Sequence, residues 1–77
     1  QMFTVEQEPS HVEIITLDET DRFEDVEVTL DEDNVVWIRQ YCEELGSFQL
    51  IYMSYQQLLD IKAALDCTHG AYIIRRA

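Results

Sequence analysis

Carboxylates are the chemically active groups that dominate this 77-residue chain, because aspartate and glutamate number 16 against five lysines and arginines. Fourteen of the 16 precede Leu45. Most of them fall in four acidic runs between hydrophobic segments, at 18–21, 24–27, 31–33 and 43–44. The formal net charge of −11 repels phosphate. We therefore predict no direct binding to nucleic acid and no binding to a membrane.

Two further chemical roles for carboxylates are not favoured by the sequence. Asp31-x-Asp33 has the form of the start of a calcium loop, but the glycine expected at the sixth position and the glutamate at the twelfth are missing. Carboxylate pairs for general acid–base catalysis fall in predicted turns, with no pocket-forming sequence around them. The sequence has no nucleophile elbow and no phosphate-binding loop. We predict that the chain is not an enzyme and binds no metal and no cofactor.

The cysteines Cys42 and Cys67 and the histidines His11 and His69 complete the set of potential metal ligands. Their spacing contains no Cys-x-x-Cys pair and no zinc pattern. Two free thiols are typical of a reducing compartment, so we predict a cytoplasmic protein. The sequence has no apolar run of about 18 residues, which predicts that it has no transmembrane helix.

Hydrophobic alternation over 35–53 is the strongest structural signal in the chain. Two runs of β-branched and aromatic residues flank the acidic turn 43–46, a pattern typical of a β-hairpin. A four-residue loop there places Trp37 opposite Tyr52 and Tyr41 opposite Phe48. The sequence therefore predicts a central hairpin that is stabilised by aromatic cross-strand pairs.

The remaining segments predict one α+β domain over residues 1–77. Ser54 followed by Gln57 has the form of a capping box, and apolar residues then recur at helical spacing. The predicted elements besides the hairpin are an edge strand over 2–5, strands over 11–17 and 23–30, a helix over 55–66 and a last strand over 71–75. The fold class is thus a four- to five-stranded antiparallel meander with one amphipathic helix packed on one face.

The turn at 31–34 decides which side chains share a face of the sheet. A four-residue loop there pairs Leu30 with Val35 and Val28 with Trp37, and opposed residues lie on the same face. This more apolar face is expected beneath the helix, with Trp37 largely buried. Its predicted members are Val12, Ile14, Val26, Val28, Leu30, Val35, Trp37, Tyr41, Phe48, Leu50 and Tyr52.

Two cations fall in apolar surroundings in this prediction. Arg39 lies between Val26 and Leu50, and Lys62 lies within the apolar arc of the helix. Both are expected to pack their stems and keep their charged heads at an edge. The alternative is a paired buried charge, for instance Lys62 with Asp66 one helical turn later.

The opposite face is half apolar and has no cover in a single chain. A two-fold dimer covers such a face with the same face of a second copy. We therefore predict a homodimer. Its predicted dimer face consists of Ile15, Leu17, Val36, Ile38, Ile51 and Met53.

A strand meander followed by one amphipathic helix resembles the fold of the single-stranded-DNA-binding transcriptional coactivators. That family binds DNA through basic and aromatic strand faces, whereas this chain has acids in those places, so the resemblance implies topology and not DNA binding. In size, acidity and lack of a catalytic motif, and in the segments 23–28 and 37–40, the chain also resembles small early proteins of bacteriophages. That resemblance implies an inhibitor of a host factor, since many of these proteins bind host proteins and some mimic DNA.

We interpret the chain as a non-enzymatic acidic protein-binding module, a phage-encoded inhibitor or DNA mimic that engages a basic site on a nucleic-acid-handling host protein. The predicted partner-binding acids are Asp18, Glu19, Asp21, Asp25, Glu27, Glu43 and Glu44. The turns that carry most of them are expected at one end of the sheet. The first alternative is a dimeric structural or regulatory subunit whose acidity only serves solubility. The second is a coactivator-type nucleic-acid binder, which would bind single strands at low salt.

Overall fold

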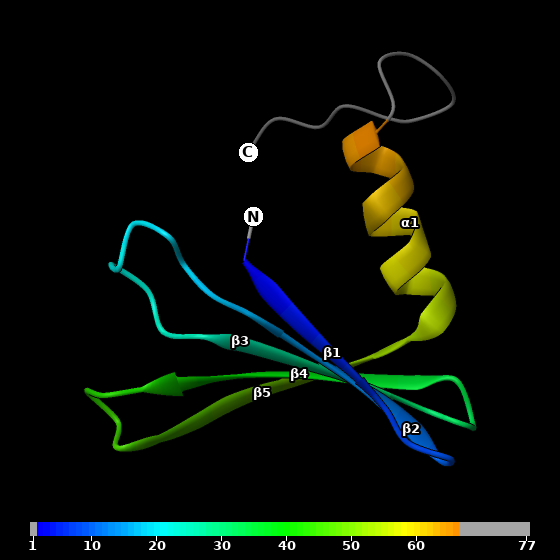
Figure 1. The fold of residues 1–77 in the computed structure, drawn as a ribbon, viewed down its shortest axis with the longest axis horizontal. Coiled ribbons are helices and arrows are strands. Elements are labelled where there is room, and N and C mark those ends of the chain that lie inside the picture. Colours follow the sequence, from blue (N-terminus) through cyan, green and yellow to red (C-terminus); the bar gives the residue numbers. More distant parts are fainter. Residues whose placement is uncertain (1, 67–77) are drawn as a thin grey trace.

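The structure is a computed structural model, and it describes residues 2–66. It contains five strands, β1 (Phe3–Gln7), β2 (His11–Thr16), β3 (Val26–Asp31), β4 (Val35–Cys42) and β5 (Ser47–Ser54), and one helix, α1 (Tyr55–Asp66). The strands form one antiparallel sheet in the order β1-β2-β3-β4-β5 (Figure 1). The predicted α+β meander is therefore confirmed, with the edge strand as its fifth member. The predicted strand over 71–75 lies outside the described residues.

The central hairpin has the predicted register. Trp37 pairs with Tyr52, and Tyr41 pairs with Phe48. In both pairs the rings meet edge to face, with centroids 6.2 Å and 5.3 Å apart. Gly46 closes the β4–β5 turn with a φ of +64°, a left-handed conformation that glycine adopts without steric cost.

The β3–β4 pairing differs from the prediction by one residue. Leu30 pairs with Val36 and Val28 with Ile38, whereas a four-residue loop would have paired Leu30 with Val35. The expected pairing of Val28 with Trp37 is therefore wrong. Trp37 is opposite Thr29, because a shift of one residue moves every side chain of a strand to the other face.

The conformation of the turn after Asp31 explains the shift. The carboxylate of Asp31 accepts hydrogen bonds from the backbone amides of Asp33 (2.9 Å) and Val35 (3.0 Å). Asn34 adopts a left-handed φ of 62°, and its amide donates to the carbonyl oxygen of Asp31 at 3.2 Å. A type I turn followed by a left-handed residue is the usual three-residue hairpin loop. The loop is thus one residue shorter than the four that we predicted.

The observed register segregates charge between the two faces of the sheet. Every charged side chain in the five strands lies on the face that carries Trp37, which we call the Trp37 face. These residues are Glu6, His11, Glu13, Glu27, Asp31 and Arg39. The other face, called the apolar face, presents Phe3, Val5, Val12, Ile14, Val26, Val28, Leu30, Val36, Ile38, Ile51 and Met53. Its remaining members are uncharged polar residues and Cys42.

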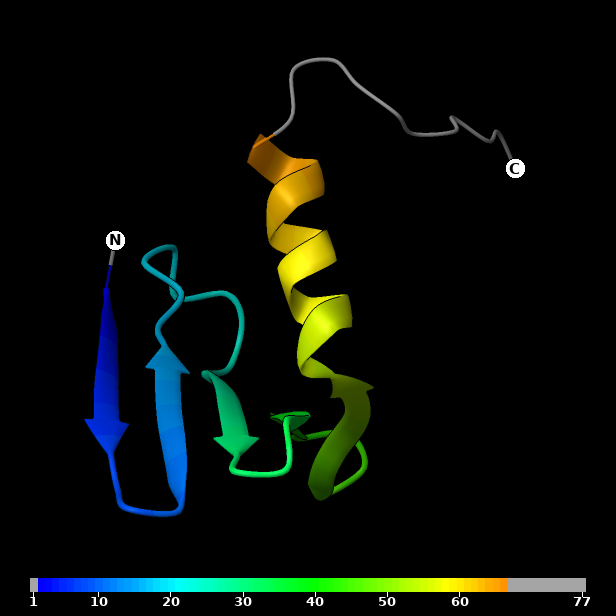
Figure 2. The same cartoon turned by 90° about the vertical axis from the view of Figure 1, so that its right-hand side faces the viewer.

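Helix α1 has the predicted bounds and the predicted capping box. The side-chain oxygen of Gln57 accepts from the Ser54 amide at 3.0 Å, and the Gln57 amide donates to the Ser54 hydroxyl at 3.1 Å. The main contacts of α1 are with β4 and β5, and none of its side chains is buried. Figures 1 and 2 show that α1 rises away from the sheet. The predicted packing of the helix over one face is therefore not confirmed.

The core of the described residues is correspondingly small. Val36, at 0% exposure, is their only buried hydrophobic residue. It lies on the apolar face near the start of α1. The prediction that Trp37 is largely buried beneath the helix is wrong, because Trp37 is half-buried and lies on the opposite face.

Candidate interaction surfaces

An acidic end of the sheet is the first candidate surface. The β2–β3 connection and the β4–β5 turn lie at the same end of the molecule (Figure 1). Together they line a shallow hollow, which we call the acidic end. Its carboxylates belong to Asp21, Glu24, Asp25, Glu43 and Glu44. The structure thus brings four of the predicted partner-binding acids together, whereas their role in binding a partner stays a prediction.

Glu24 is the acid in this cluster that the prediction did not include. Its pKa is raised, first because it shares a hydrogen bond with the Glu43 carboxyl, and further because of desolvation and repulsion from Glu43, Asp25 and Asp21. Its place in the acidic run 24–27 was visible in the sequence. Its proximity to Glu43 was not, because it depends on the path of the β2–β3 connection.

Asp18 was predicted to bind a partner, and in the structure it also organises its own loop. Its carboxylate accepts hydrogen bonds from the hydroxyl and amide of Thr20 and from the amides of Arg22 and Phe23 at 2.9 Å. These bonds, chiefly those from Thr20, lower the pKa of Asp18 from 3.8 to about 2. Glu19 precedes Thr20 in the same connection. We conclude that the Asp18 carboxylate stabilises the conformation of the β2–β3 connection, which carries part of the acidic end.

Glu27 does not belong to the acidic end. It lies on the Trp37 face and accepts a 3.0 Å hydrogen bond from the Arg39 guanidinium. Arg39 also stacks over Phe48, 4.3 Å from the ring centroid. The predicted position of Arg39 between Val26 and Leu50 is wrong, because the observed register puts Glu27 in the place of Val26. On the helix, Lys62 forms an ion pair with Asp66 at 3.3 Å, but both side chains are exposed, so the pair is not the buried one of the alternative.

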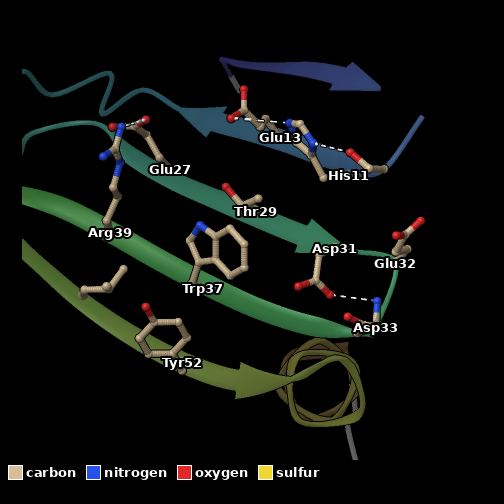
Figure 3. A pocket seen from close by; sticks show the side chains of 12 residues that line it. His11, Glu13, Glu27, Thr29, Asp31, Glu32, Asp33, Trp37, Arg39 and Tyr52 are labelled. Atoms are coloured by element: carbon tan, nitrogen blue, oxygen red, sulfur yellow. Dashed lines mark hydrogen bonds and ion pairs between the residues drawn. The ribbon is translucent and has the colours of Figure 1, made fainter. Parts of the chain in front are cut away.

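The Trp37 face forms a second, broader hollow (Figure 3). Trp37 and Tyr52 lie side by side on its floor, and carboxylates stand around them. These carboxylates belong to Glu13, Glu27, Asp31, Glu32 and Asp33. This surface was not predicted from the sequence, because the predicted register had placed Trp37 beneath the helix.

A hydroxyl, an imidazole and a carboxylate meet at the rim of this hollow (Figure 3). The Ser10 hydroxyl is 3.3 Å from Nδ1 of His11, and Nε2 of His11 is 3.8 Å from the Glu13 carboxylate. The second distance is longer than a hydrogen bond. Catalytic groups of these types must be held in place by hydrogen bonds from nucleophile to base and from base to carboxylate. We therefore regard the contact as a surface pair.

The predicted dimer face is only partly assembled. Ile38, Ile51 and Met53 lie together on the apolar face, whereas Val36 is buried within the chain. Ile15 lies on the Trp37 face opposite Glu27, so its assignment was wrong by the same one-residue shift. Leu17 follows the end of β2. The residues that replace Ile15 and Leu17 on this face are Phe3, Val5, Val12, Ile14, Val26, Val28 and Leu30.

Residues 2–66 contain no group of three or more histidine, cysteine or acidic side chains that could hold a metal ion. No helix in this part of the chain has the length and apolar character required to span a membrane. Cys67 and His69 lie outside the described residues.

The fold and its surfaces define a class of protein, a small acidic α+β meander whose sheet is charged on one face and apolar on the other. Residues 4–64 match the family described as "Domain of unknown function (DUF8831)", and the chain belongs to this family. No curated protein matches the chain, and no solved structure matches it.

Proposed function

We propose that this chain is a non-enzymatic protein-binding module whose acidic end engages a basic surface on a protein that handles nucleic acids. The crowding of carboxylates around Glu24 carries the proposal. Glu43, Asp25 and Asp21 raise the pKa of Glu24, so the charged cluster opposes the folded state. Charges that oppose folding are expected where they serve binding.

The geometry of the acidic end supports attraction to a cation-rich partner. Among the described residues that line the hollow, Arg22 is the only cation beside five acids. A concentrated negative field raises the rate of association with a positive surface, and salt screens it over about 10 Å at 0.1 M. Spaced carboxylates can occupy a cationic cleft in place of phosphates. We therefore propose further that the chain is a cytoplasmic, phage-encoded inhibitor that mimics DNA.

A second candidate function is that of a dimeric structural or regulatory subunit. The uncovered apolar face favours it, because monomeric proteins rarely expose large contiguous apolar patches. The two functions are compatible, since the carboxylates of the acidic end lie in the β2–β3 connection and the β4–β5 turn, whereas the strands carry no charged side chain on the apolar face.

Two fourfold variants with equal charge test the proposal. The first changes the acidic end, as Asp21→Asn, Asp25→Asn, Glu43→Gln and Glu44→Gln. The control changes exposed acids elsewhere, as Glu6→Gln, Glu8→Gln, Glu32→Gln and Asp33→Asn. Asp18 and Asp31 are kept in both, because their carboxylates hold turns together.

The measurement starts with capture of a partner from a host lysate by the tagged wild-type chain. The affinity of the purified partner for each variant is then measured at low and high salt, with and without duplex DNA as competitor. We expect the acidic-end variant to bind at least tenfold more weakly at low salt and the control to bind like wild type, with DNA competing. The proposal is wrong if both variants bind alike or if DNA does not compete.

A further inference from the structure

The apolar face is an extended surface that residues 2–66 of a single chain leave open. It runs across all five strands without a charged side chain. Phe3, Val5 and Ile51 on this face are 58%, 48% and 56% exposed. The contacts of α1 with β4 and β5 leave β1, β2 and β3 without a cover on this side (Figure 2).

Helix α1 carries a second apolar surface that its own sheet does not cover. A hollow on the helix is lined only by α1 side chains, those of Tyr55, Leu58, Leu59, Ile61, Lys62, Leu65 and Asp66. Leu65 is 83% exposed. The start of the helix lies beside the end of β5, where Gln57, Asp60 and Ile61 line a hollow together with Ile51, Tyr52 and Met53.

We infer that a second copy of this chain covers both surfaces, with α1 of each copy lying across β1–β3 on the apolar face of the other. The arrangement is isologous, because each chain offers the same helix and receives it on the same sheet face. This assembly does not depend on the proposed function, because its contacts are made by apolar side chains of β1–β3 and α1 and not by the carboxylates of the acidic end.

Charge argues for a second copy as the occupant. Two chains of net charge −11 can approach closely only through surfaces that are free of carboxylates. The apolar face meets that condition over all five strands. The Lys62–Asp66 ion pair borders the helical stripe and adds no net charge to it. A basic partner protein would instead be drawn to the acidic end or to the Trp37 face.

The available area also fits a dimer. The three strands β1–β3, about 4.8 Å apart and about 20 Å long, give a sheet surface of roughly 290 Å² in projection. A 12-residue helix of about 18 Å by 10 Å adds roughly 180 Å². The accessible area of a surface with protruding side chains exceeds its projection, so each copy can supply the ~800 Å² that a standard stable interface buries per partner.

Neighbouring residues of α1 provide a matched test. Leu65→Glu and Ala64→Glu place the same charge in the same helical turn, but only Leu65 belongs to the apolar stripe. Both side chains are exposed in the single chain, so neither change removes a contact that the fold needs. In sedimentation of the full chain we expect a wild-type dimer, an Ala64→Glu dimer, and a dissociation constant at least tenfold higher for Leu65→Glu.

The salt dependence of association distinguishes this assembly from binding of a partner through the acidic end. Screening removes repulsion between two acidic copies, so the dimer should tighten as salt rises, whereas attraction to a basic partner weakens. A second matched pair of variants, Val28→Glu and Thr29→Glu, tests the sheet surface of the interface in the same way. Val28 lies on the apolar face and Thr29 on the Trp37 face, and circular dichroism checks that both variants fold. A wild-type monomer at about 100 µM at all salt concentrations would overturn the inference, since a standard interface binds more tightly than this. Equal association of Leu65→Glu and Ala64→Glu would also overturn it.

Discussion

Asp18 accepts hydrogen bonds from three backbone amides of the β2–β3 connection, and Glu24 is pressed against Glu43 at the end of the same connection. The pKa of Asp18 is lowered to about 2, whereas the pKa of Glu24 is raised. A lowered pKa means that the ionised Asp18 stabilises the fold at neutral pH. A raised pKa means that the ionised Glu24 destabilises it. Two acids six residues apart therefore contribute to stability with opposite signs.

Asp18→Asn should lower the melting temperature at pH 7, because one amide oxygen cannot replace the bonds of a carboxylate. In the wild type this stabilisation is fully present above pH 3.8 and is lost as the pH falls towards 2. The difference between wild type and variant should therefore shrink over that interval. Asp21→Asn, which removes the same charge from the same loop, is the control and should not lower the melting temperature. Thermal unfolding followed by circular dichroism between pH 7 and pH 2 checks both.

Glu24→Gln should raise the melting temperature at pH 7, because it removes the repulsion that raises the pKa of Glu24. The gain should disappear as the pH falls through that raised pKa, where the wild-type carboxyl also becomes neutral. Glu32→Gln, at the opposite end of the sheet, removes an equal charge from an exposed turn. Equal stabilisation by both changes would show that only net charge matters and that the cluster has no local effect.

The sequence predicted much of the acidic end, but it predicted neither the structural role of Asp18 nor the position of Glu27. The meander topology was enough to bring the turns that carry Asp21 and Glu43 to one end. The structural role of Asp18 depends on the loop conformation that points three amides at it. Glu27 was assigned to the wrong face because its neighbour across the strands follows from the β3–β4 register. The types of these acidic residues were visible in the sequence, whereas the hydrogen-bond partners of Asp18 and Glu27 were not.

At the scale of elements, one turn accounts for most of the differences between prediction and structure. The predicted four-residue loop covers 31–34, whereas the observed three-residue loop covers only 32–34. The left-handed Asn34 and the two amides bound by Asp31 select the shorter loop. That choice moves Trp37 to an open face and Val28 to the apolar face. The strands were otherwise predicted well, because period-two alternation does not depend on the loop, but the strand predicted over 23–30 is observed as β3 from Val26 to Asp31.

Helix α1 should depend on its capping box more than a packed helix does. None of its side chains is buried, so packing against its own chain supplies little stability. Ser54→Ala removes the hydroxyl that accepts from the Gln57 amide and should cost about 1 kcal/mol of helix stability. The ellipticity at 222 nm should fall while the β-sheet signal is kept. Ser47→Ala, at the other end of β5, is the control, and an equal loss of helix there would contradict the prediction.

The bounds of α1 were predictable from sequence and its packing was not. Capping and helical spacing are local properties, and both are read from residues 54–66 alone. The amphipathic stripe shows that the helix needs an apolar cover, but it does not show which chain provides that cover. The prediction assumed that the cover is the helix's own sheet.

At the scale of the whole molecule, the chain combines a high net charge with a very small core. Val36 is the only buried hydrophobic residue of residues 2–66, although 47% of the chain is hydrophobic. Small domains with little buried apolar surface usually gain stability from oligomerisation, metals or disulfides. If a second copy covers the apolar face, association supplies that stability, and folding and assembly are then linked.

This linkage predicts a melting temperature that depends on protein concentration. Binding of a partner that recognises only the folded chain stabilises it by mass action, so the melting temperature should rise over a roughly hundredfold increase in concentration. Leu65→Glu should lower the melting temperature and weaken its concentration dependence, because the variant side chain opposes the interface but touches little in the single chain. Ala64→Glu should retain the wild-type dependence. Scanning calorimetry across the concentration series checks all three chains, and a constant wild-type melting temperature would show that the small core suffices by itself.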